Sequence, residues 1–336
     1  MHLLTLQTAE VVDQVEKTFR EGCYHTTRIM HAPKTHCVDV IATSPDRSNS
    51  LVTKIVENID GTSKDLLSEL MLLGYFLRAT PIVVGSCNRR SELEDNTVYF
   101  RLDGHIIAFN LNTFVQIFKH QVHPQKIAQR GGFMYQINGE ELKRLREKQS
   151  ISRKYLSEAL DISTKTIAEY ERKKIVNSQV KHVEKLEDIL HQDLKQSIGI
   201  YDYPKKPMKI VQNKPSPHAP NTEIAHEVSD KLTELNIFQF WPNNSPFDVF
   251  LIIPGEENKV HVVSGIFSNI QREDLSRLQK IAQIVKIRNK MGAVRAIVED
   301  RNDVKQCKEM GVIPIESKKL KEAEKPQEIV KILSMR

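Results

Sequence analysis

The side chains with the clearest chemical potential lie close together between residues 152 and 174. Thr164, Lys165 and Thr166 carry hydroxyl and ammonium groups in one short run, and such groups can hydrogen-bond to the edges of nucleic-acid bases. The residues around this run are hydroxyl-bearing or basic, which suits contact with phosphate oxygens: Ser152, Arg153, Lys154, Ser163, Arg172, Lys173 and Lys174. The segment therefore predicts a nucleic-acid contact in which the first group meets bases and the second meets the backbone.

Two short helices joined by a tight turn must position these residues. Ser152 and Ser163 are the predicted N-caps, because a serine hydroxyl accepts hydrogen bonds from the free N–H groups of a first helical turn. Apolar residues recur at helical spacing on one face of each helix: Leu156, Ala159 and Leu160, then Ile167 and Tyr170. Residues 161–163 form the turn. This spacing is typical of a helix-turn-helix, whose second helix enters the major groove of DNA.

The segment from 138 to 190 resembles the DNA-binding domain of Cro- and phage-repressor-type regulators. The matching residues include Leu142, Leu145, Ser152, Leu156, Ala159, Ile162, Ser163, Thr166, Ile167 and Glu171. Asp161 stands where that family often has glycine, and Asp accepts left-handed backbone geometry better than most residues. A second family glycine, after the recognition helix, is replaced by basic residues, so the sequence does not fix where that helix ends. The alternative interpretation is a helical hairpin that only packs, with solvated charges.

The N-terminal part alternates between the periodicities of helices and strands. The predicted order is a helix, three strands, a helix and a strand, at residues 8–20, 24–31, 37–43, 51–58, 63–78 and 81–85. A hairpin over 97–110 follows, turning at Asp103-Gly104, because Asp-Gly favours a tight reversal. Then come a short helix at 113–120, a polar connector at 121–130 and a strand at 132–137. This region is therefore expected to be an α/β domain.

The order of these elements resembles the core of the PD-(D/E)XK nuclease-like fold. That family gathers an Asp and an acidic-x-Lys triplet around a divalent metal; Asp39 matches the Asp and Lys54 the lysine. The acidic position holds Val52, which cannot ligate Mg²⁺, and Glu57 lies an odd number of residues from the lysine, on the other strand face. The resemblance implies a nuclease-like scaffold without catalysis, with Asp39 and Lys54 as a residual buried ion pair. A metal-dependent nuclease that uses these two residues is the alternative.

The C-terminal part shows an internal echo of the first domain. The run FDVFLIIPG at 247–255 lines up with VDVIATSPD at 38–46, so Asp248 corresponds to Asp39, with Ser264 or Val263 near the lysine position. The predicted elements are helices and strands in mixed order, at residues 222–235, 247–253, 259–265, 272–291, 294–299, 303–310 and 312–316. Before them, residues 201–220 are rich in proline and lysine, which predicts an extended linker. It acts either as a spacer or as a basic strap on the DNA backbone.

Four parts are therefore expected in the 336 residues. They are a nuclease-like α/β domain at 1–128, an all-α helix-turn-helix domain at 129–200, the linker at 201–220, and an α/β domain at 221–336 that is a degenerate repeat of the first. The net charge of +6 is compatible with nucleic-acid binding. No apolar run approaches the length of a membrane span, so no membrane contact is expected. A cytoplasmic location is what the resemblance to Cro-type regulators implies.

The cysteines and histidines do not predict a metal site. The four cysteines, Cys23, Cys37, Cys87 and Cys307, form no C-x-x-C pair and are expected to be reduced thiols. Cysteine and histidine cluster between residues 23 and 37, but their spacing fits no zinc knuckle. No metal and no cofactor are therefore predicted.

Three further runs extend the resemblance beyond the helix-turn-helix. They are KIVENIDG at 54–61, PIVVGS at 81–86 and LEDNTVYFRLDG at 93–104, with GGF at 131–133 leading into the DNA-binding segment. Together they resemble a family of archaeal transcriptional regulators of the Cro type. The resemblance implies a non-enzymatic regulator that binds double-stranded DNA, with a homodimer expected from the family habit of binding two half-sites. The effector or transcription-machinery partner is unknown, and a non-enzymatic protein-interaction scaffold is a further alternative.

Overall fold

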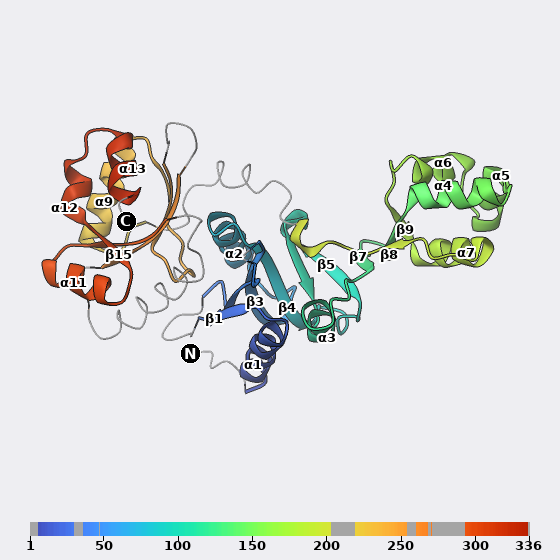
Figure 1. Ribbon diagram of the computed structural model, residues 1–336, viewed down its shortest axis with the longest axis horizontal. Coiled ribbons are helices and arrows are strands. Elements are labelled where there is room, and N and C mark those ends of the chain that lie inside the picture. Colours follow the sequence, from blue (N-terminus) through green and yellow to red (C-terminus); the bar gives the residue numbers. More distant parts are fainter. Residues whose placement is uncertain are drawn as a thin grey trace.

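The computed structural model describes residues 6–29, 36–46, 48–202, 219–253, 260–267, 270 and 293–334. The chain is elongated, with a helical bundle at one end, a large sheet in the middle and a second α/β unit at the other end (Figure 1). The strands form one ten-stranded and one five-stranded sheet. Among the described residues, none of the helices has the length and apolar character of a membrane span.

The middle part, here called the body, has the predicted order of elements. They are α1 (Leu6–Glu21), β1 (His25–Arg28), β2 (Val40–Thr43), β3 (Ser50–Asn58), α2 (Lys64–Phe76), β4 (Thr80–Cys87), β5 (Thr97–Arg101), β6 (Ile106–Phe109) and α3 (Leu111–Phe118). The strands lie in the order β1-β2-β3-β4-β6-β5. The β1–β2 and β2–β3 pairs are antiparallel, and the β3–β4 and β4–β6 pairs are parallel. The predicted hairpin between β5 and β6 is confirmed.

Helices cover both faces of the body sheet. On one face α1 and α3 bring together Phe19, Phe114 and Phe118, whose ring centroids lie 4.7–4.8 Å apart. On the other face lies α2, whose N-cap is Ser63, the first residue of the helix predicted at 63–78. Most of α2 is buried, which is unusual for a helix packed on a single sheet face and is typical of one covered from a second side.

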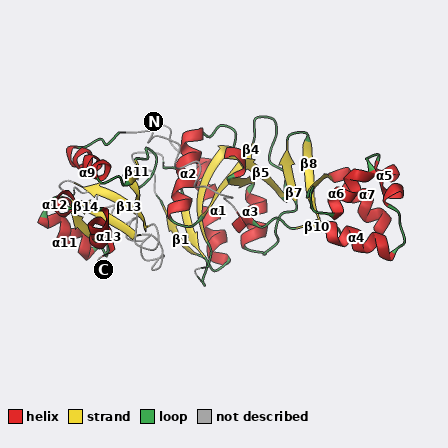
Figure 2. Ribbon diagram, turned by 90° about the horizontal axis from the view of Figure 1, so that it is seen from above, coloured by secondary structure: helices red, strands yellow, loops and turns green. Residues whose placement is uncertain are grey.

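The body sheet continues into the helical bundle through a neck of short strands. These are β7 (Lys126–Gln129), β8 (Gly132–Ile137), β9 (Asn177–Gln179) and β10 (Lys195–Gln196), with β8 paired to all the other three. Figure 2 shows the body strands leading through β7 and β8 to the bundle. The predicted polar connector at 121–130 is wrong in part, because 126–129 is a strand. Only Ile127 of β7 is buried, so the strand leaves almost no apolar pattern.

The bundle is inserted into the body and held at both ends. Its helices are α4 (Gly139–Lys148), α5 (Arg153–Leu160), α6 (Thr164–Glu171) and α7 (Val180–Leu190). They bury one apolar core, with Leu142, Leu156, Ile167 and Leu186 at 0% exposure. After β10 the chain returns to the body, where the Ile198 N–H donates to Pro124 O over 2.8 Å. The bundle is therefore anchored by an entering strand and a returning strand.

The strands of the C-terminal unit pair in the same series of directions as β1-β2-β3-β4-β6 of the body. Its elements are α9 (Glu223–Glu234), β11 (Phe238–Phe240), β12 (Val249–Ile253), β13 (Val260–Phe267), β14 (Ala293–Val298), α11 (Arg301–Glu309), β15 (Ile313–Glu316), α12 (Ser317–Glu322) and α13 (Pro326–Ser334). Along β11-β12-β13-β14-β15 the first two pairs are antiparallel and the next two parallel. The predicted helix at 272–291 and linker residues 203–218 lie outside the described residues.

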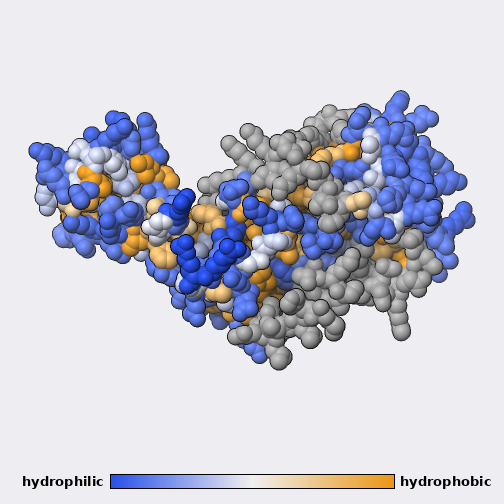
Figure 3. All heavy atoms as spheres, turned by 180° about the vertical axis from the view of Figure 1, so that it is seen from behind, coloured by the Kyte–Doolittle hydropathy of each residue, from blue (hydrophilic) through white to orange (hydrophobic). Residues whose placement is uncertain are grey.

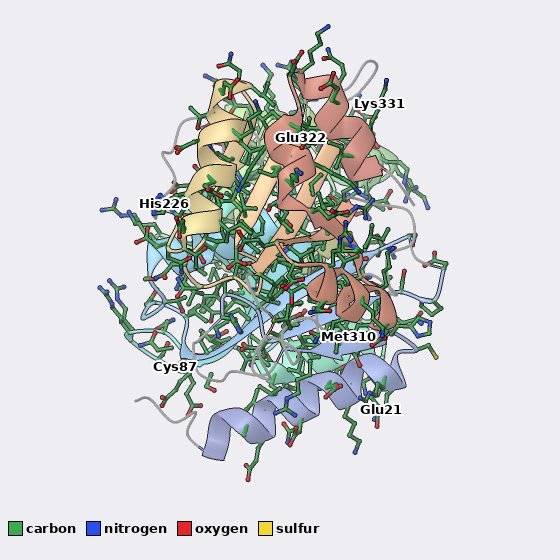
Figure 4. The ribbon with its side chains drawn as sticks, turned by 90° about the vertical axis from the view of Figure 1, so that its left-hand side faces the viewer. Glu21, Cys87, His226, Met310, Glu322 and Lys331 are labelled. Atoms are coloured by element: carbon green, nitrogen blue, oxygen red, sulfur yellow. The ribbon has the colours of Figure 1, made fainter. Side chains whose placement is uncertain are left out.

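The body and the C-terminal unit meet across a seam. In Figure 4, α9, α12 and α13, which carry His226, Glu322 and Lys331, lie on the side away from α1. On the inner side, the rings of Phe76 in α2 and Phe250 in β12 are 5.1 Å apart. One hydrophobic cluster contains residues of both parts. The seam explains why α2 is buried nearly all round, since it has a sheet on each side.

Candidate nucleic-acid interface

The two helices of the predicted helix-turn-helix are capped as the sequence indicates. Ser152 Oγ accepts from the Tyr155 N–H and Ser163 Oγ from the Thr166 N–H, both over 3.0 Å. Asp161 ends α5 with φ 55° and ψ 49°. That is the left-handed conformation expected where the family often has glycine. The turn therefore forms with an aspartate in the strained position.

The end of α6 uses a lysine where glycine is usual. Lys173 has φ 56° and donates its N–H to Tyr170 O over 3.0 Å, while the Lys174 N–H reaches Glu169 O over 2.9 Å. These two bonds form a Schellman ending. The helix thus ends at Glu171, which answers the question that the missing glycine left open.

A buried carboxylate joins α6 to the two helices before it. Glu171, whose side chain is 1% exposed, accepts from Arg146 Nε of α4 over 2.6 Å and from Arg153 Nη2 of α5 over 2.7 Å. Burial raises the pKa of the Glu171 carboxyl, but the hydrogen bonds and charges of Arg146 and Arg153 outweigh it, and the pKa is lowered. A charged Glu171 therefore fixes the angle between the recognition helix and its supports.

Close packing at the start of α4 adds to this rigidity. A Cβ atom on Gly139 would lie 1.9 Å from Tyr170 O in α6, so only glycine fits at this contact. Asn138 caps α4 by accepting from the Glu141 N–H over 3.1 Å. The beginning of α4 and the end of α6 are thus held in one arrangement.

The three predicted base-contact residues lie in the first turn of α6 and differ in exposure and in hydrogen bonding. Lys165 is the most exposed, with 84% of its side chain accessible and only Glu169 nearby at 4.0 Å. Thr164 is exposed, and its Oγ1 lies 3.1 Å from Ser157 Oγ. Thr166 is half-buried and hydrogen-bonded to Ser163 Oγ over 2.8 Å. Lys165 is therefore the side chain best able to reach outward.

The seven predicted backbone-contact residues do not share one environment. Lys154, Arg172, Lys173 and Lys174 are exposed around α5 and α6, as are Ser152 and Ser163. Arg153 is different, because its Nε and Nη2 atoms are already held by Glu171. Its first role is therefore to support α6.

The positive charge of the chain is concentrated in this region. Residues 129–220 hold eighteen Lys and Arg against twelve Asp and Glu, which accounts for the whole net charge of +6. Figure 3 shows the bundle covered largely by hydrophilic side chains. The bundle residues 129–200 contribute fourteen Lys and Arg against eleven Asp and Glu, and residues 201–220 the rest of the excess. Basic side chains around an exposed helix are suited to a polyanion.

The nuclease-like residues form a closed pair in the body. Lys54 Nζ donates to Asp39 Oδ1 over 3.0 Å and to His36 O over 2.9 Å, and both charged side chains are buried. The other oxygen of Asp39, Oδ2, accepts from the Ile55 N–H. Val52 in β3 is fully buried. The predicted ion pair is confirmed, and both carboxylate oxygens of Asp39 are engaged by the protein.

The C-terminal unit covers the helix beside this pair. Glu69 of α2 is 1% exposed, and its two carboxylate oxygens accept from the N–H groups of Asn243 and Asn244 over 2.8 and 2.6 Å. The Cys37 N–H donates to Asn244 O. These contacts join segments 174 or more residues apart, so sequence patterns could not have identified them.

Asp248 repeats the backbone contacts of Asp39. The Asp39 N–H donates to Thr53 O and its Oδ2 accepts from Ile55. The Asp248 N–H likewise donates to Ser264 O over 2.9 Å, and its Oδ2 accepts from the Ile266 N–H over 2.7 Å. By these contacts Gly265 lies where Lys54 lies in the body, one residue after Ser264, which the sequence placed near that position. The strand register is the same in both units, but the connection between the paired strands is two residues longer here, which a short repeat could not reveal.

Arg146 was missed by sequence reasoning, although the sequence carries a signal for it. It follows Leu142 by four residues, so it falls on the apolar face of α4. A basic side chain on such a face predicts a buried partner. That partner is Glu171, which the resemblance had named only as part of a pattern.

Comparison with known proteins agrees with both resemblances. The model of the PD-(D/E)XK superfamily domain matches residues 8–124, and the Helix-turn-helix model matches residues 142–195. No solved structure matches the chain significantly.

Several archaeal proteins align along most of the chain. A protein of Methanococcus maripaludis strain C6 is 30% identical over 293 residues, covering 83% of this chain and 85% of its own length. One of Thermococcus gammatolerans is 27% identical over 331 residues (98% and 96%), and one of Pyrococcus furiosus 29% over 323 residues (95% and 96%). Each bears the name "Putative HTH-type transcriptional regulatory protein". The chain belongs to this family of archaeal HTH-type transcriptional regulatory proteins.

Proposed function

We propose that the chain regulates transcription by sequence-specific binding to double-stranded DNA, with α6 in the major groove. The observation that carries the proposal is the exposed first turn of α6, held rigidly by buried Glu171. A fixed helix whose N-terminal turn is free can present side chains to base edges at a defined depth. Thr164, Lys165 and Thr166 are the proposed base-contact residues.

The proposed backbone contacts come from the basic and hydroxyl groups around α5 and α6. Lys154, Arg172, Lys173 and Lys174 would neutralise phosphates and release counterions. Ser152 and Ser163 lie at helix N-termini, where free N–H groups favour anions. Arg153 would contribute through the edge of its guanidinium that Glu171 does not use.

We infer a homodimer as the DNA-bound form, because helix-turn-helix proteins commonly read two half-sites about one helical turn apart. We assign a separate role to each of the four predicted parts, which are residues 1–128, 129–200, 201–220 and 221–336. The bundle reads DNA and the linker adds basic charge. The flanking units carry dimer or partner contacts.

We further propose that both flanking units are nuclease-like folds without catalysis. Matching strand directions in the two sheets and the shared backbone contacts of Asp39 and Asp248 support the repeat. A missing carboxylate at Val52 and the closed Asp39–Lys54 pair argue against metal-dependent cleavage. Mg²⁺ prefers carboxylate and water oxygens, and here both Asp39 oxygens are occupied.

The deciding experiment is selection of bound duplexes from a random pool by the full chain. We expect one sequence to be enriched. With Lys165→Ala we expect the preference for one base to weaken at a single position. The binding free energy for the selected sequence should become less favourable by about 1–3 kcal/mol. Lys185→Ala, which removes an exposed lysine from α7, is the matched control and should leave the selected sequence unchanged. A pool with no enrichment, or a Lys165→Ala variant identical to the parent, would reject the proposal.

A nuclease remains the rival function because the PD-(D/E)XK model matches the body. It predicts cleavage of DNA in Mg²⁺ or Mn²⁺ that Asp39→Asn abolishes. A protein-interaction scaffold instead predicts capture of the same partner with and without DNA. The selection experiment separates both from a sequence-specific regulator.

A further inference from the structure

A cleft opens between the body and the helical bundle, beside the neck. It has a volume of about 310 Å³ and is lined by Glu94, Lys126, Phe133, Tyr135, Val180 and Glu184. Glu94 precedes β5 of the body, while Val180 and Glu184 belong to α7 of the bundle. The neck strands β7 and β8 supply the remaining residues. The cleft thus has one wall from each part of the molecule.

Two aromatic side chains line the cleft, and one of them already binds a cation of the chain. Phe133 and Tyr135 are two residues apart on β8, so they face the same side of the strand, and Lys126 lies opposite Tyr135 in the β7–β8 pair. The ammonium of Lys195 sits 5.1 Å from the centre of the Tyr135 ring. Rings attract cations through their electron-rich faces, and this ring already holds one from the chain.

The charges at the rim leave one carboxylate in excess. Lys126 Nζ lies 3.5 Å from Glu94 Oε2, so these two charges offset each other. Glu184 is exposed on α7, and no ion pair connects it to another described residue. An incoming cation therefore finds an uncompensated carboxylate next to an aromatic and apolar surface of Phe133 and Val180.

We propose that this cleft binds a small organic amine, with its ammonium at Glu184 and its apolar or aromatic body against Phe133 and Val180. A cleft of this volume holds a ligand of about the size of an amino-acid side chain with its amine. The ligand touches α7 and the body together, so it joins the two walls. The proposal concerns binding only and stands apart from any effect on DNA.

The first test is isothermal titration of the full chain with three probes that share one phenylpropyl body. They are 3-phenylpropylamine, 3-phenylpropanamide and 3-phenylpropionate. We expect one site for the amine and at least about tenfold weaker binding of the amide and the carboxylate, since a charged hydrogen bond is worth about that factor. Equal binding of all three, or no binding of the amine, overturns the proposal.

Two variants move the affinity in opposite directions. Glu184→Gln should weaken the amine about tenfold, because it removes the partner charge. Lys126→Met should strengthen it, because Glu94 then becomes a second uncompensated carboxylate. Glu158→Gln on α5, with 65% of its side chain exposed, makes the same charge change outside the cleft and should change nothing. An affinity unaffected by Glu184→Gln, or lowered by Lys126→Met in a normally folded chain, contradicts the site.

Discussion

Glu171, at the end of the recognition helix, lies 2.6 Å from Arg146 of α4 and is almost completely buried. The contact spans twenty-five residues and links the first helix of the bundle to the third. Because Arg153 binds the same carboxylate, three helices meet at one charge. The orientation of α6 relative to α4 and α5 therefore depends on this buried charge cluster as well as on apolar packing.

Arg146→Met should loosen α6 from α4. Methionine keeps much of the buried stem, but one oxygen of Glu171 loses its donor. Breaking a buried pair costs roughly 3–5 kcal/mol. Because Arg153 remains as a partner, we expect the free energy of local unfolding of α6 to fall by about 2–3 kcal/mol. Hydrogen exchange of the amides in Thr164–Glu171 measures this loss. Arg144→Met, at an exposed pair with Glu141, is the control, and protection equal in both variants would contradict the role of Arg146.

The stability of the bundle should fall in acid because of Glu171. Its pKa is lowered in the folded chain from the ordinary value of 4.5. The stabilisation is therefore complete above pH 4.5 and is lost as the pH falls through the lower folded pKa. Urea unfolding of the bundle, followed by hydrogen exchange at several pH values, should show this slope. Glu171→Gln should flatten it. If both chains lose stability equally below pH 4.5, another carboxylate is responsible.

Lys173→Gly should stabilise the end of α6 while weakening DNA binding. The left-handed backbone costs a lysine about 1 kcal/mol that glycine avoids. Glycine's greater freedom when unfolded and the loss of the exposed ion pair between Lys173 and Glu140, 2.8 Å apart, offset part of this. We therefore expect a gain of at most roughly 0.5 kcal/mol. The lost charge should lower the salt slope of DNA affinity by about one unit.

Lys174→Gly is the matched control for this position. It removes the same charge from the neighbouring residue, whose φ is not positive. The salt slope should fall equally, but the stability should not rise. Thermal unfolding and fluorescence titration of labelled duplex at several salt concentrations distinguish the two variants. A gain in stability from both glycines would show that backbone conformation is not the cause.

Asp39→Asn should destabilise the body, because we propose that Asp39 has a structural role and not a catalytic one. It leaves the Lys54 ammonium buried with a neutral partner, which we expect to cost about 3–5 kcal/mol. Replacing the pair together, as Asp39→Leu with Lys54→Met, should recover much of that loss. Hydrogen exchange of the amides in β3 and β4, the strands beside the pair, measures this loss in the body. Cleavage of DNA by the parent chain in Mg²⁺ that is absent in Asp39→Asn would contradict a structural role.

Features that depend on nearby residues could be predicted from the sequence. Ser152, Ser163 and Ser63 cap their helices because a hydroxyl three residues from a free N–H is a local arrangement. Asp161 takes the left-handed turn for a similarly local reason. The Asp39–Lys54 pair was predicted because both residues match the motif of the nuclease-like fold that the sequence resembles. The helix-turn-helix and the order of the body elements follow from these patterns.

Features that depend on distant partners could not be predicted. The strands β7, β9 and β10 are short and mostly polar, and they exist because β8 offers backbone partners. Glu69 looks like a helix-surface residue until Asn243 and Asn244 approach it from the other unit. The position of Gly265 is set by the pairing of β12 with β13, because the connection between these strands is two residues longer than that between β2 and β3. In each case the missing information lies in pairing across the chain.

The neck has a consequence for how the chain lies along a duplex. Strand β8 is paired with β7 of the body and with β9 and β10, which flank α7, so turning the bundle against the body requires breaking main-chain hydrogen bonds. If α6 lies in a DNA groove, the orientation of the body relative to the duplex is therefore fixed as well. In the proposed DNA complex each chain would extend to one fixed side of the bases that α6 contacts, giving an asymmetric footprint that nuclease protection can map.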